Sequence, residues 1–227
     1  MARVLNPATH AVRRDAFMDA AMRLAQAKGY EALSIQEVID DVGASKGAFY
    51  HYFGSKADLL EAVVERMADA IQLTWDELMA RPGIPAAERL HDMFTSTARY
   101  KNARRELVLV VLEGWLNDSN AVVRDKLRQI VRRRMKPMLV RILRQGIEDG
   151  DFTATDPEST ADVIVTMILG AQDEATELFV ASQAGLVTYD QVARHFEAYE
   201  EALIRILGYR AGRLSLVDPP TLRLWFG

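Results

Sequence analysis

Residues 44–60 read ASKGAFYHYFGSKADLL, and this stretch decides the fold class of the chain. Residues 49–53, FYHYF, place five rings in succession, which is more than one buried helix face can hold. Ser45 and Ser55 are typical N-cap residues, and Gly54 separates the two helices that they begin. The stretch therefore predicts a short helix starting at Ser45, followed by a long helix starting at Ser55.

A second short helix is expected immediately before this stretch. Ser34 and Glu37 have the spacing of a capping box, and Gly43 ends the helix after about two turns. Further upstream, an apolar stripe with helical spacing runs from Val12 to Ala27. Two short helices joined by a tight turn make a helix-turn-helix, whose second helix can enter the DNA major groove.

A helical wheel of residues 45–53 divides the rings between two faces. Phe49 and Phe53 share one face and are expected to pack on Phe17. The outward residues are small, basic or hydrogen-bonding, so the backbone can approach base edges while side chains reach phosphates. They are Lys46, Gly47, Tyr50 and His51, with Ala48 beside them.

Lys56 stands where the dipole of the long helix favours an anion. A DNA phosphate at this N-terminus would be held by free backbone amides and by the Lys56 ammonium together. We therefore interpret Lys56 as a phosphate contact. Outside this motif it would be read as an ordinary solvated lysine.

The rest of the chain also has helical spacing, and no segment shows the alternation of a strand. The sequence predicts an all-α protein in which a three-helix unit is joined by the long helix to a larger helical domain. We expect domains at 1–54 and 55–208, and an irregular apolar tail at 209–227. Further helices are expected at roughly 86–101, 104–116, 119–149, 156–182 and 188–207.

Composition excludes several classes of protein. The 227 residues carry a net charge of −4 and include no cysteine, which excludes disulfides and thiolate metal sites. The four histidines are scattered, and no catalytic or nucleotide-binding motif occurs. No apolar run approaches the roughly 18 residues of a membrane span, and no signal-peptide core is present. We expect a cytoplasmic protein that is not an enzyme, binds no membrane and needs no metal or cofactor.

Residues 25–63, AQAKGYEALSIQEVIDDVGASKGAFYHYFGSKADLLEAV, resemble the TetR family of bacterial transcriptional regulators, most specifically in FYHYFGSKxxL. The resemblance implies a homodimer whose helical C-terminal domain binds a small ligand, which changes the spacing of two reading heads and releases DNA. Arg13 and Arg14 resemble the basic arm of some members. Positions that match the usual DNA contacts of the family are Ser34, Ser45, Lys46, Gly47, Ala48, Tyr50, His51 and Lys56.

A small hydrophobic or amphipathic effector would bind among the helices after residue 60. Glu113 and Arg134 are lone charges in apolar helices, so each either reaches solvent, pairs with the other or holds a polar group of the ligand. Methionine and aromatic residues at helical spacing more often form ordinary core. The candidate lining is Trp75, Met79, Met93, Phe94, Thr97, Leu109, Glu113, Trp115, Arg134, Met138, Ile142, Met167 and Gln172.

Two other surfaces are predicted in the C-terminal part. Residues 124–144 hold nine lysines and arginines against one aspartate. A second nucleic-acid surface is possible there, but pairing with acids on neighbouring helices is favoured. The last two long helices suit a four-helix dimer seam. Its expected residues are Ile164, Ile168, Ala171, Ala175, Leu178, Val192, Phe196, Leu203 and Leu207.

These observations favour a ligand-responsive dimeric regulator that binds a palindromic operator in double-stranded DNA, with repression as the simplest mode. The sequence leaves three alternatives open. One is an activator or a ligand-independent regulator of the same fold. Another is a helical small-molecule-binding protein without sequence-specific DNA binding. The third is a helical enzyme that uses a cavity in the C-terminal domain.

Overall fold

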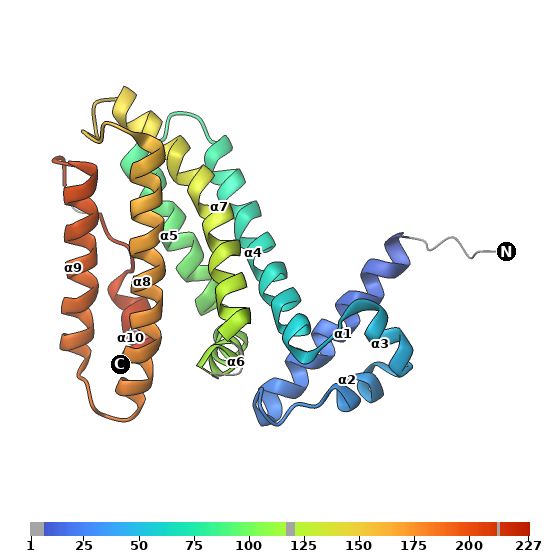
Figure 1. The fold of residues 1–227 in the computed structure, drawn as a ribbon. Helices are drawn as coiled ribbons and strands as arrows, with labels where there is room; N and C mark the ends of the chain where they lie inside the picture. Colours follow the sequence, from blue (N-terminus) through green and yellow to red (C-terminus); the bar gives the residue numbers. More distant parts are fainter. Residues whose placement is uncertain (1–6, 117–120, 213) are drawn as a thin grey trace. The chain divides into compact units, whose positions relative to one another are not determined.

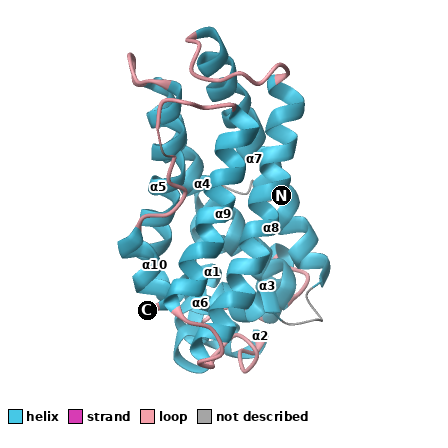
Figure 2. Ribbon diagram, turned by 90° about the vertical axis from the view of Figure 1, so that its left-hand side faces the viewer, coloured by secondary structure: helices cyan, strands magenta, loops and turns pink. Residues whose placement is uncertain are grey.

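A computed structural model describes residues 7–116, 121–212 and 214–227, and every regular element within them is a helix (Figure 2). The prediction of an all-α protein is therefore confirmed. The helices are α1 (Pro7–Lys28), α2 (Ile35–Val42), α3 (Lys46–Tyr52), α4 (Lys56–Ala80), α5 (Ala86–Asn102), α6 (Arg105–Leu116), α7 (Ala121–Glu148), α8 (Pro157–Gln183), α9 (Tyr189–Leu207) and α10 (Pro219–Phe226).

The described chain divides into two compact units, and the divisions fall inside α4, between α5 and α6, and inside α7. The first unit holds the chain up to Met67 together with Arg104–Leu127, and the second holds Ala68–Ala103 together with Arg128–Gly227. This division differs from the linear domain boundaries expected from the sequence. Helix α6 belongs with the N-terminal helices, and the C-terminal tail belongs with the larger helical unit.

In the first unit, α2 and α3 lie together beside α1 (Figure 1). The predicted capping box is present at the start of α2: Glu37 N donates to Ser34 Oγ (3.3 Å), and Ser34 N donates to Glu37 Oε2 (3.0 Å). Gly43 ends α2 with a φ of 65°, a left-handed conformation that glycine adopts without strain. Helix α3 starts where Ala48 N donates to Ser45 Oγ (3.1 Å).

Aromatic rings hold α3 against α1, as the helical wheel predicted. Phe17, Phe49 and Phe53 are all buried. The ring of Phe17 meets that of Phe49 edge-on, with centroids 5.5 Å apart, and that of Phe53 at 6.3 Å. Ring pairs in this arrangement stabilise a core beyond the area that they bury. The orientation of α3 therefore depends on the ring cluster of Phe17, Phe49 and Phe53.

Glu113 of α6 caps the turn between α1 and α2. Its Oε2 accepts a hydrogen bond from Tyr30 N (2.9 Å), and its Oε1 accepts one from Glu31 N (3.4 Å). The turn begins at Gly29, which has a φ of 87°, and a Cβ there would lie 2.8 Å from Glu113 Oε1. Because amides just beyond a helix end lack helical partners, a carboxylate that accepts from two of them stabilises the turn.

In the second unit, α4 is tied to α5 by two side chains. Trp75 is buried, and its Nε1 donates to Met93 O (3.2 Å) and Thr97 Oγ1 (3.1 Å). Arg89 is 6% exposed, and its Nη1 donates to Leu78 O (2.7 Å) in the last turn of α4. A guanidinium at this position satisfies carbonyls that the helix leaves free and complements the negative end of its dipole.

Ion pairs join α7 to α8 in the same unit. Arg128 pairs with Asp173 (2.5 Å), Lys136 with Asp162 (2.7 Å) and Arg144 with Glu158 (2.9 Å). Several basic residues of 124–144 therefore meet acids on a neighbouring helix, as the favoured interpretation of this run predicted. Arg134 likewise pairs with Asp69 of α4.

Helices α8 and α9 lie side by side, and their apolar faces are used differently from the prediction (Figure 1). Ile164, Ile168, Val192, Leu203 and Leu207 are buried within a single chain. These five side chains cannot form the dimer seam expected of them, because they are already buried in the single chain, whereas Ala171, Ala175, Leu178 and Phe196 of the same prediction are only half-buried. The larger hydrophobic side chains left exposed here are Val163, Val180 and Leu186.

The C-terminal tail is more ordered than expected, because its last part forms α10. Asp218 caps this helix by accepting from Thr221 N (2.7 Å), and Pro219 occupies its first position. Helix α10 packs on α5, α8 and α9. Asn102 fixes it to α5 by donating to Thr221 Oγ1 (2.8 Å) and accepting from Trp225 Nε1 (2.7 Å). The Asp-Pro-Pro sequence could have predicted this helix, because an aspartate N-cap followed by proline is typical of a helix start.

Replacing the turn-capping carboxylate tests its structural role. Glu113→Gln should lower the free energy of unfolding by about 1–3 kcal/mol, because an amide presents one neutral acceptor to two backbone N–H groups. Urea unfolding followed by circular dichroism measures the change. Glu106→Gln, at an exposed site on the same helix, is the control and should stay within about 0.5 kcal/mol of wild type. Equal stability of the two variants would contradict the capping role.

The α2 capping box makes stability depend on pH. The hydrogen bond from Lys28, and then those from Ser34, lower the pKa of Glu37 from 4.5 to about 2. A carboxyl whose pKa is lowered on folding stabilises the fold above its unfolded pKa, and this contribution is lost as pH falls through the folded pKa. Between pH 4.5 and 2, Glu37→Gln should therefore lose less stability than wild type.

Urea midpoints measured at steps across that range test the Glu37 prediction. Lys28→Met should reproduce part of the flattening, because the lysine is the largest cause of the shift. Parallel pH profiles for wild type and Glu37→Gln would show that this pKa is not lowered in the fold.

Candidate nucleic-acid interface

Helix α3 presents its predicted reading face to solvent. Ser45, Lys46, Gly47 and His51 are exposed and Ala48 is half-buried. Tyr50 is 47% exposed, whereas the adjacent Phe49 is 0% exposed. Neighbouring residues therefore take opposite roles, because α3 buries one side on α1 and leaves the other side free for a partner.

The two candidate serines differ in what they can still donate. The Ser34 hydroxyl donates to Glu37 Oε2 (2.6 Å), so its proton is used inside the capping box. The Ser45 hydroxyl accepts from Ala48 N, and the described structure records no acceptor for its own proton. Ser45 can therefore donate to a phosphate oxygen while it still caps α3.

Lys46 and His51 lie beside other rings of the exposed face. The Nζ of Lys46 lies 6.0 Å from the centroid of the Tyr50 ring, at the limit of a cation–π contact. The His51 ring lies 5.5 Å from that of His10 and 5.1 Å from that of Tyr52. These contacts limit the freedom of the side chains before any partner binds, which lowers the entropic cost of recognition.

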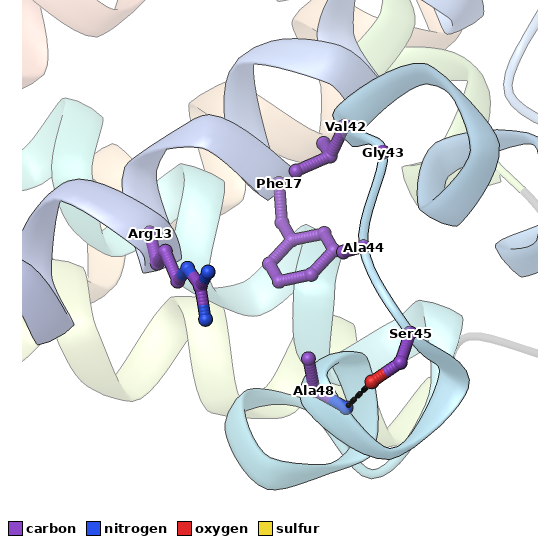
Figure 3. A pocket seen from close by; sticks show the side chains of 7 residues that line it. All are labelled: Arg13, Phe17, Val42, Gly43, Ala44, Ser45 and Ala48. Atoms are coloured by element: carbon purple, nitrogen blue, oxygen red, sulfur yellow. Dashed lines mark hydrogen bonds between the residues drawn. The ribbon is translucent and has the colours of Figure 1, made fainter.

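A hollow of about 190 Å³ lies between α1, the turn after α2 and the start of α3 (Figure 3). The exposed Arg13 directs its guanidinium along one side of it, opposite the residues of the turn. Arg14 instead places its guanidinium 5.7 Å from the centroid of the Phe53 ring. Of the two arginines likened to a basic arm, Arg13 is thus the more available. The hollow is lined by Arg13, Phe17, Val42, Gly43, Ala44, Ser45 and Ala48.

The acids of α2, the helix that precedes the reading helix, are engaged by side chains of the first unit. Asp41 pairs with Arg23 (2.6 Å), and Glu37 pairs with Lys28. Asp40 accepts a hydrogen bond from Gln36 Nε2 (2.8 Å). Helix α3 itself contains no acid. Since like charge near a phosphate would repel it, partial neutralisation of α2 leaves the exposed face of α3 suited to an anionic backbone.

The surroundings of Lys56 differ from those that the sequence predicted. Ser55 and Asp58 cap α4, with Asp58 N donating to Ser55 Oγ (3.1 Å) and Gly54 N donating to Asp58 Oδ2 (3.1 Å). Asp58 is thus the anion at the positive end of the dipole, so no external phosphate is needed to explain the local sequence.

The ammonium of Lys56 turns toward the α1–α2 turn. It donates to Glu31 O (3.2 Å) and lies 4.2 Å from the centroid of the Tyr30 ring. Burial lowers the pKa of Lys56, against an opposing effect of the Glu31 and Glu113 carboxylates. An ammonium has three protons, so a phosphate contact by Lys56 stays a prediction.

The candidate ligand residues are divided between the two units. Trp75, Met93, Met138 and Ile142 are buried in one hydrophobic core of the second unit, with Met79, Phe94 and Met167 packed against it. Thr97 reaches this group through its bond to Trp75, and Gln172 is half-buried on α8. Leu109, Glu113 and Trp115 belong to α6 in the first unit, and the Trp115 side chain lies outside the described residues.

The two lone charges among the candidates do not pair with each other. Glu113 accepts from the amides of the α1–α2 turn, and Arg134 pairs with Asp69. The sequence interpretation missed both of these partners.

No group of three or more His, Cys, Asp or Glu residues in the described ranges is placed to hold a metal ion. Among the described helices, none combines the length and the apolar composition that a bilayer crossing needs.

Two family models match the chain. Residues 17–63 match the model described as bacterial regulatory proteins of the tetR family, and residues 83–173 match the model of a tetracyclin repressor-like C-terminal domain. The first match covers the helix-turn-helix, including all of the predicted DNA contacts. The second covers α5, α6, α7 and α8 as far as Asp173.

Curated relatives and solved structures agree with these models. The chain is 24% identical over 162 residues to the HTH-type transcriptional repressor KstR2 of Mycolicibacterium smegmatis, covering 71% of this chain and 77% of that protein. It is 39% identical over 56 residues to the HTH-type transcriptional regulator BetI of Rhizobium meliloti, covering 25% of this chain and 28% of BetI. The crystal structure of RolR with resorcinol has the same fold, with a TM-score of 0.60, 18% identity and coverage of 96% and 95%.

Proteins of this family are DNA-binding regulators rather than enzymes, and dimerisation and release by ligands are general features of the family. The matched models, the helix-turn-helix geometry and the named relatives all indicate the same family. This chain belongs to the TetR family of bacterial transcriptional regulators.

Proposed function

We propose that two copies of this protein place α3 in successive major grooves of a palindromic operator and repress transcription until an effector binds. The observation that carries this proposal is the exposed, acid-free face of α3 over a buried aromatic cluster. Half-sites about one helical turn apart, or slightly more, would match two reading helices. A regulator that binds the chromosome works in the cytoplasm.

Each exposed group has a role in this proposal. Lys46 contacts a guanine edge or a phosphate, and Gly47 and Ala48 allow the backbone to approach the bases. Phosphates are contacted by Tyr50, His51 and Ser45, and Lys56 supplies a further cation there. The Ser34 hydroxyl would have to leave Glu37 to make the same contact. Arg13, at the edge of the hollow, extends the contact along the backbone.

The effector site is proposed in the core of the second unit, beside the later half of α4. An effector there alters the packing of Trp75 and Thr97, which joins α4 to α5. Because α4 is continuous from Lys56 to Ala80, a shift of its later half is carried to the end that follows α3. A coupling of about 1–3 kcal/mol between effector and DNA is typical of such a system.

The dimer is proposed to form through the outward faces of α8 and α9. Val163 and Val180 remain 52% and 46% exposed there, and Leu186 is 77% exposed in the connecting turn. Two such helices from each copy would bury these side chains in a four-helix seam.

Selection from a random pool of DNA duplexes at about physiological salt tests the proposed function. Sequencing the retained DNA should reveal a palindrome whose half-site spacing equals the distance between the two reading helices. A reporter downstream of that operator then separates repression from activation. Failure to enrich any sequence would favour a small-molecule-binding protein that lacks specific DNA recognition.

Adjacent residues of α3 should respond oppositely to substitution. Tyr50→Ala should weaken operator binding by about 1–3 kcal/mol per half-site and leave the unfolding transition near that of wild type. Phe49→Ala should instead cost about 3–5 kcal/mol of stability, because it empties a buried ring site. Fluorescence anisotropy with labelled operator and urea unfolding measure the two effects.

Lys46→Ala provides a second test of the same face. It should weaken binding and lower the slope of log affinity against log salt by about 1 if Lys46 contacts a phosphate. Unchanged operator affinity in both Lys46→Ala and Tyr50→Ala would refute the assignment of this face.

A further inference from the structure

Two histidines meet where the start of α1 passes the end of α3. The His10 ring meets the His51 ring edge-on, with centroids 5.5 Å apart, and lies 4.5 Å from the Tyr52 ring. The centroids of His51 and Tyr52 are 5.1 Å apart. We call His10, His51 and Tyr52 the histidine cluster. It continues the buried rings, since the Tyr52 ring lies 5.9 Å from that of Phe17, so packing fixes its place on the first unit.

The ring nitrogens of both histidines in this cluster are unused. His51 is exposed and His10 is half-buried, and the structure records no hydrogen bond or ion pair from either ring to any of the described residues. The other two histidines of the chain have polar partners. His91 Nδ1 lies 3.1 Å from a backbone carbonyl oxygen, and His195 Nε2 lies 2.5 Å from a carboxylate oxygen. The two histidines with spare hydrogen-bonding capacity are therefore the two beside the reading face.

The helices that carry the histidine cluster place cations beside it. The first turn of α1 and the whole of α3 contain no acid. The guanidinium of Arg14 lies over the Phe53 ring, and the ammonium of Lys46 lies near the Tyr50 ring. Arg13 borders the hollow between α1 and α3. A proton added to either histidine thus finds further positive charge along both helices.

Most carboxylates on the surrounding elements have partners of their own. Asp15 and Asp19 of α1 face Arg66 (3.8 and 2.8 Å), and the three acids of α2 have the partners given above. Asp58 of α4 and Glu113 of α6 accept from backbone amides. The structure records no contact of a described carboxylate with the histidine cluster, so a DNA phosphate would supply the counter-ion that an imidazolium needs there.

The histidine cluster lies at the end of α3 that faces away from the bases. A recognition helix contacts base edges mainly with its N-terminal residues, so groups at its other end meet the sugar–phosphate backbone. His51 is in the last turn of α3, and His10 belongs to a different helix. The pair therefore spans the reading helix and the helix beside it, at the edge of the groove.

We propose that His10 and His51 together hold one phosphate of the operator as imidazolium ions, so that DNA binding takes up protons. The inference rests on the proposed function, because it adds a backbone contact at the edge of the reading face. A neutral imidazole offers one N–H group, whereas an imidazolium offers two N–H groups and a positive charge. The protonated pair is thus the form that suits a phosphate.

Proton uptake fixes the sign of the pH dependence. An unperturbed histidine titrates near pH 6.5, a range in which the DNA backbone stays ionised. When a complex holds more protons than its separate components, its affinity rises as pH falls. Operator affinity at constant ionic strength should therefore increase at least about fivefold between pH 8 and pH 6.

Fluorescence anisotropy of the full-length protein with labelled operator measures this affinity ratio. His10→Gln and His51→Gln should each reduce the ratio, because glutamine donates a hydrogen bond but does not titrate. The double variant should bring the ratio below about twofold. His10→Lys carries a permanent charge, so it should bind more tightly than wild type at pH 8 and show a flatter pH profile.

His91→Gln is the matched control, because His91 belongs to the second unit and its ring nitrogens have partners within that unit. It should keep the wild-type affinity ratio. A purely structural role of His10 predicts a different result, namely that His10→Gln weakens operator binding by the same factor at both pH values.

Salt dependence gives an independent readout of the same contact. For wild type, the slope of log affinity against log salt should be steeper at pH 6 than at pH 8 by about 1 for each proton taken up. The double variant of His10 and His51 should give the same slope at both pH values.

Three results would overturn the role of the histidine cluster. They are operator binding by wild type that is independent of pH, an unchanged affinity ratio in the double variant, and no binding of any duplex DNA at pH 6 and low salt.

Duplex DNA of random sequence separates this inference from the proposed function. A phosphate contact does not read sequence, so the affinity ratio should also appear with random duplexes. Proton-linked DNA binding without any selected operator would refute the proposed function and uphold the histidine cluster. A selected operator that is bound equally at both pH values would do the reverse.

Discussion

The packing of Phe17 against Phe49 and Phe53 is the contact on which the reading surface depends. Helix α3 spans only Lys46–Tyr52, and a helix of this length is not stable alone in water. Its existence and its direction therefore come from the rings that it buries on α1. The exposure of Tyr50 and its neighbours follows from this burial, because a short helix with one side fixed must present the other side outward.

Charged side chains in this protein repeatedly complete backbone that helices leave unsatisfied. Glu113 accepts from the amides of the α1–α2 turn, and Arg89 donates to the last carbonyls of α4. Asp58 does the same for the amide of Gly54. These interactions hold the turns in place, since an amide or carbonyl without a partner is costly when buried.

Helix α4 is the element through which effector and operator would communicate. Its first turn is fixed by Ser55 and Asp58, and its later half is bonded to α5 through Trp75. In our proposal an effector acts on the same face of α5 that receives the Trp75 indole. The signal then needs no long chain of contacts, because one continuous helix connects both ends.

The sequence by itself determined the helical fold, the caps of α2 and α3, and the division of α3 into a buried and an exposed face. These features are local: they depend on helical period and on residues three or four apart. It also indicated that the basic run of 124–144 would pair with acids, although it did not identify the partners.

The tertiary structure alone decided which charges are satisfied and which apolar faces are already covered. Glu113 and Arg134, which the sequence singled out as lone charges in apolar helices, have separate partners that lie far from them in sequence. Five of the nine residues of the expected dimer stripe of α8 and α9 are instead internal core, and α10 covers part of these helices. Such outcomes depend on contacts between distant segments, and no pattern of residues along one helix specifies its neighbour.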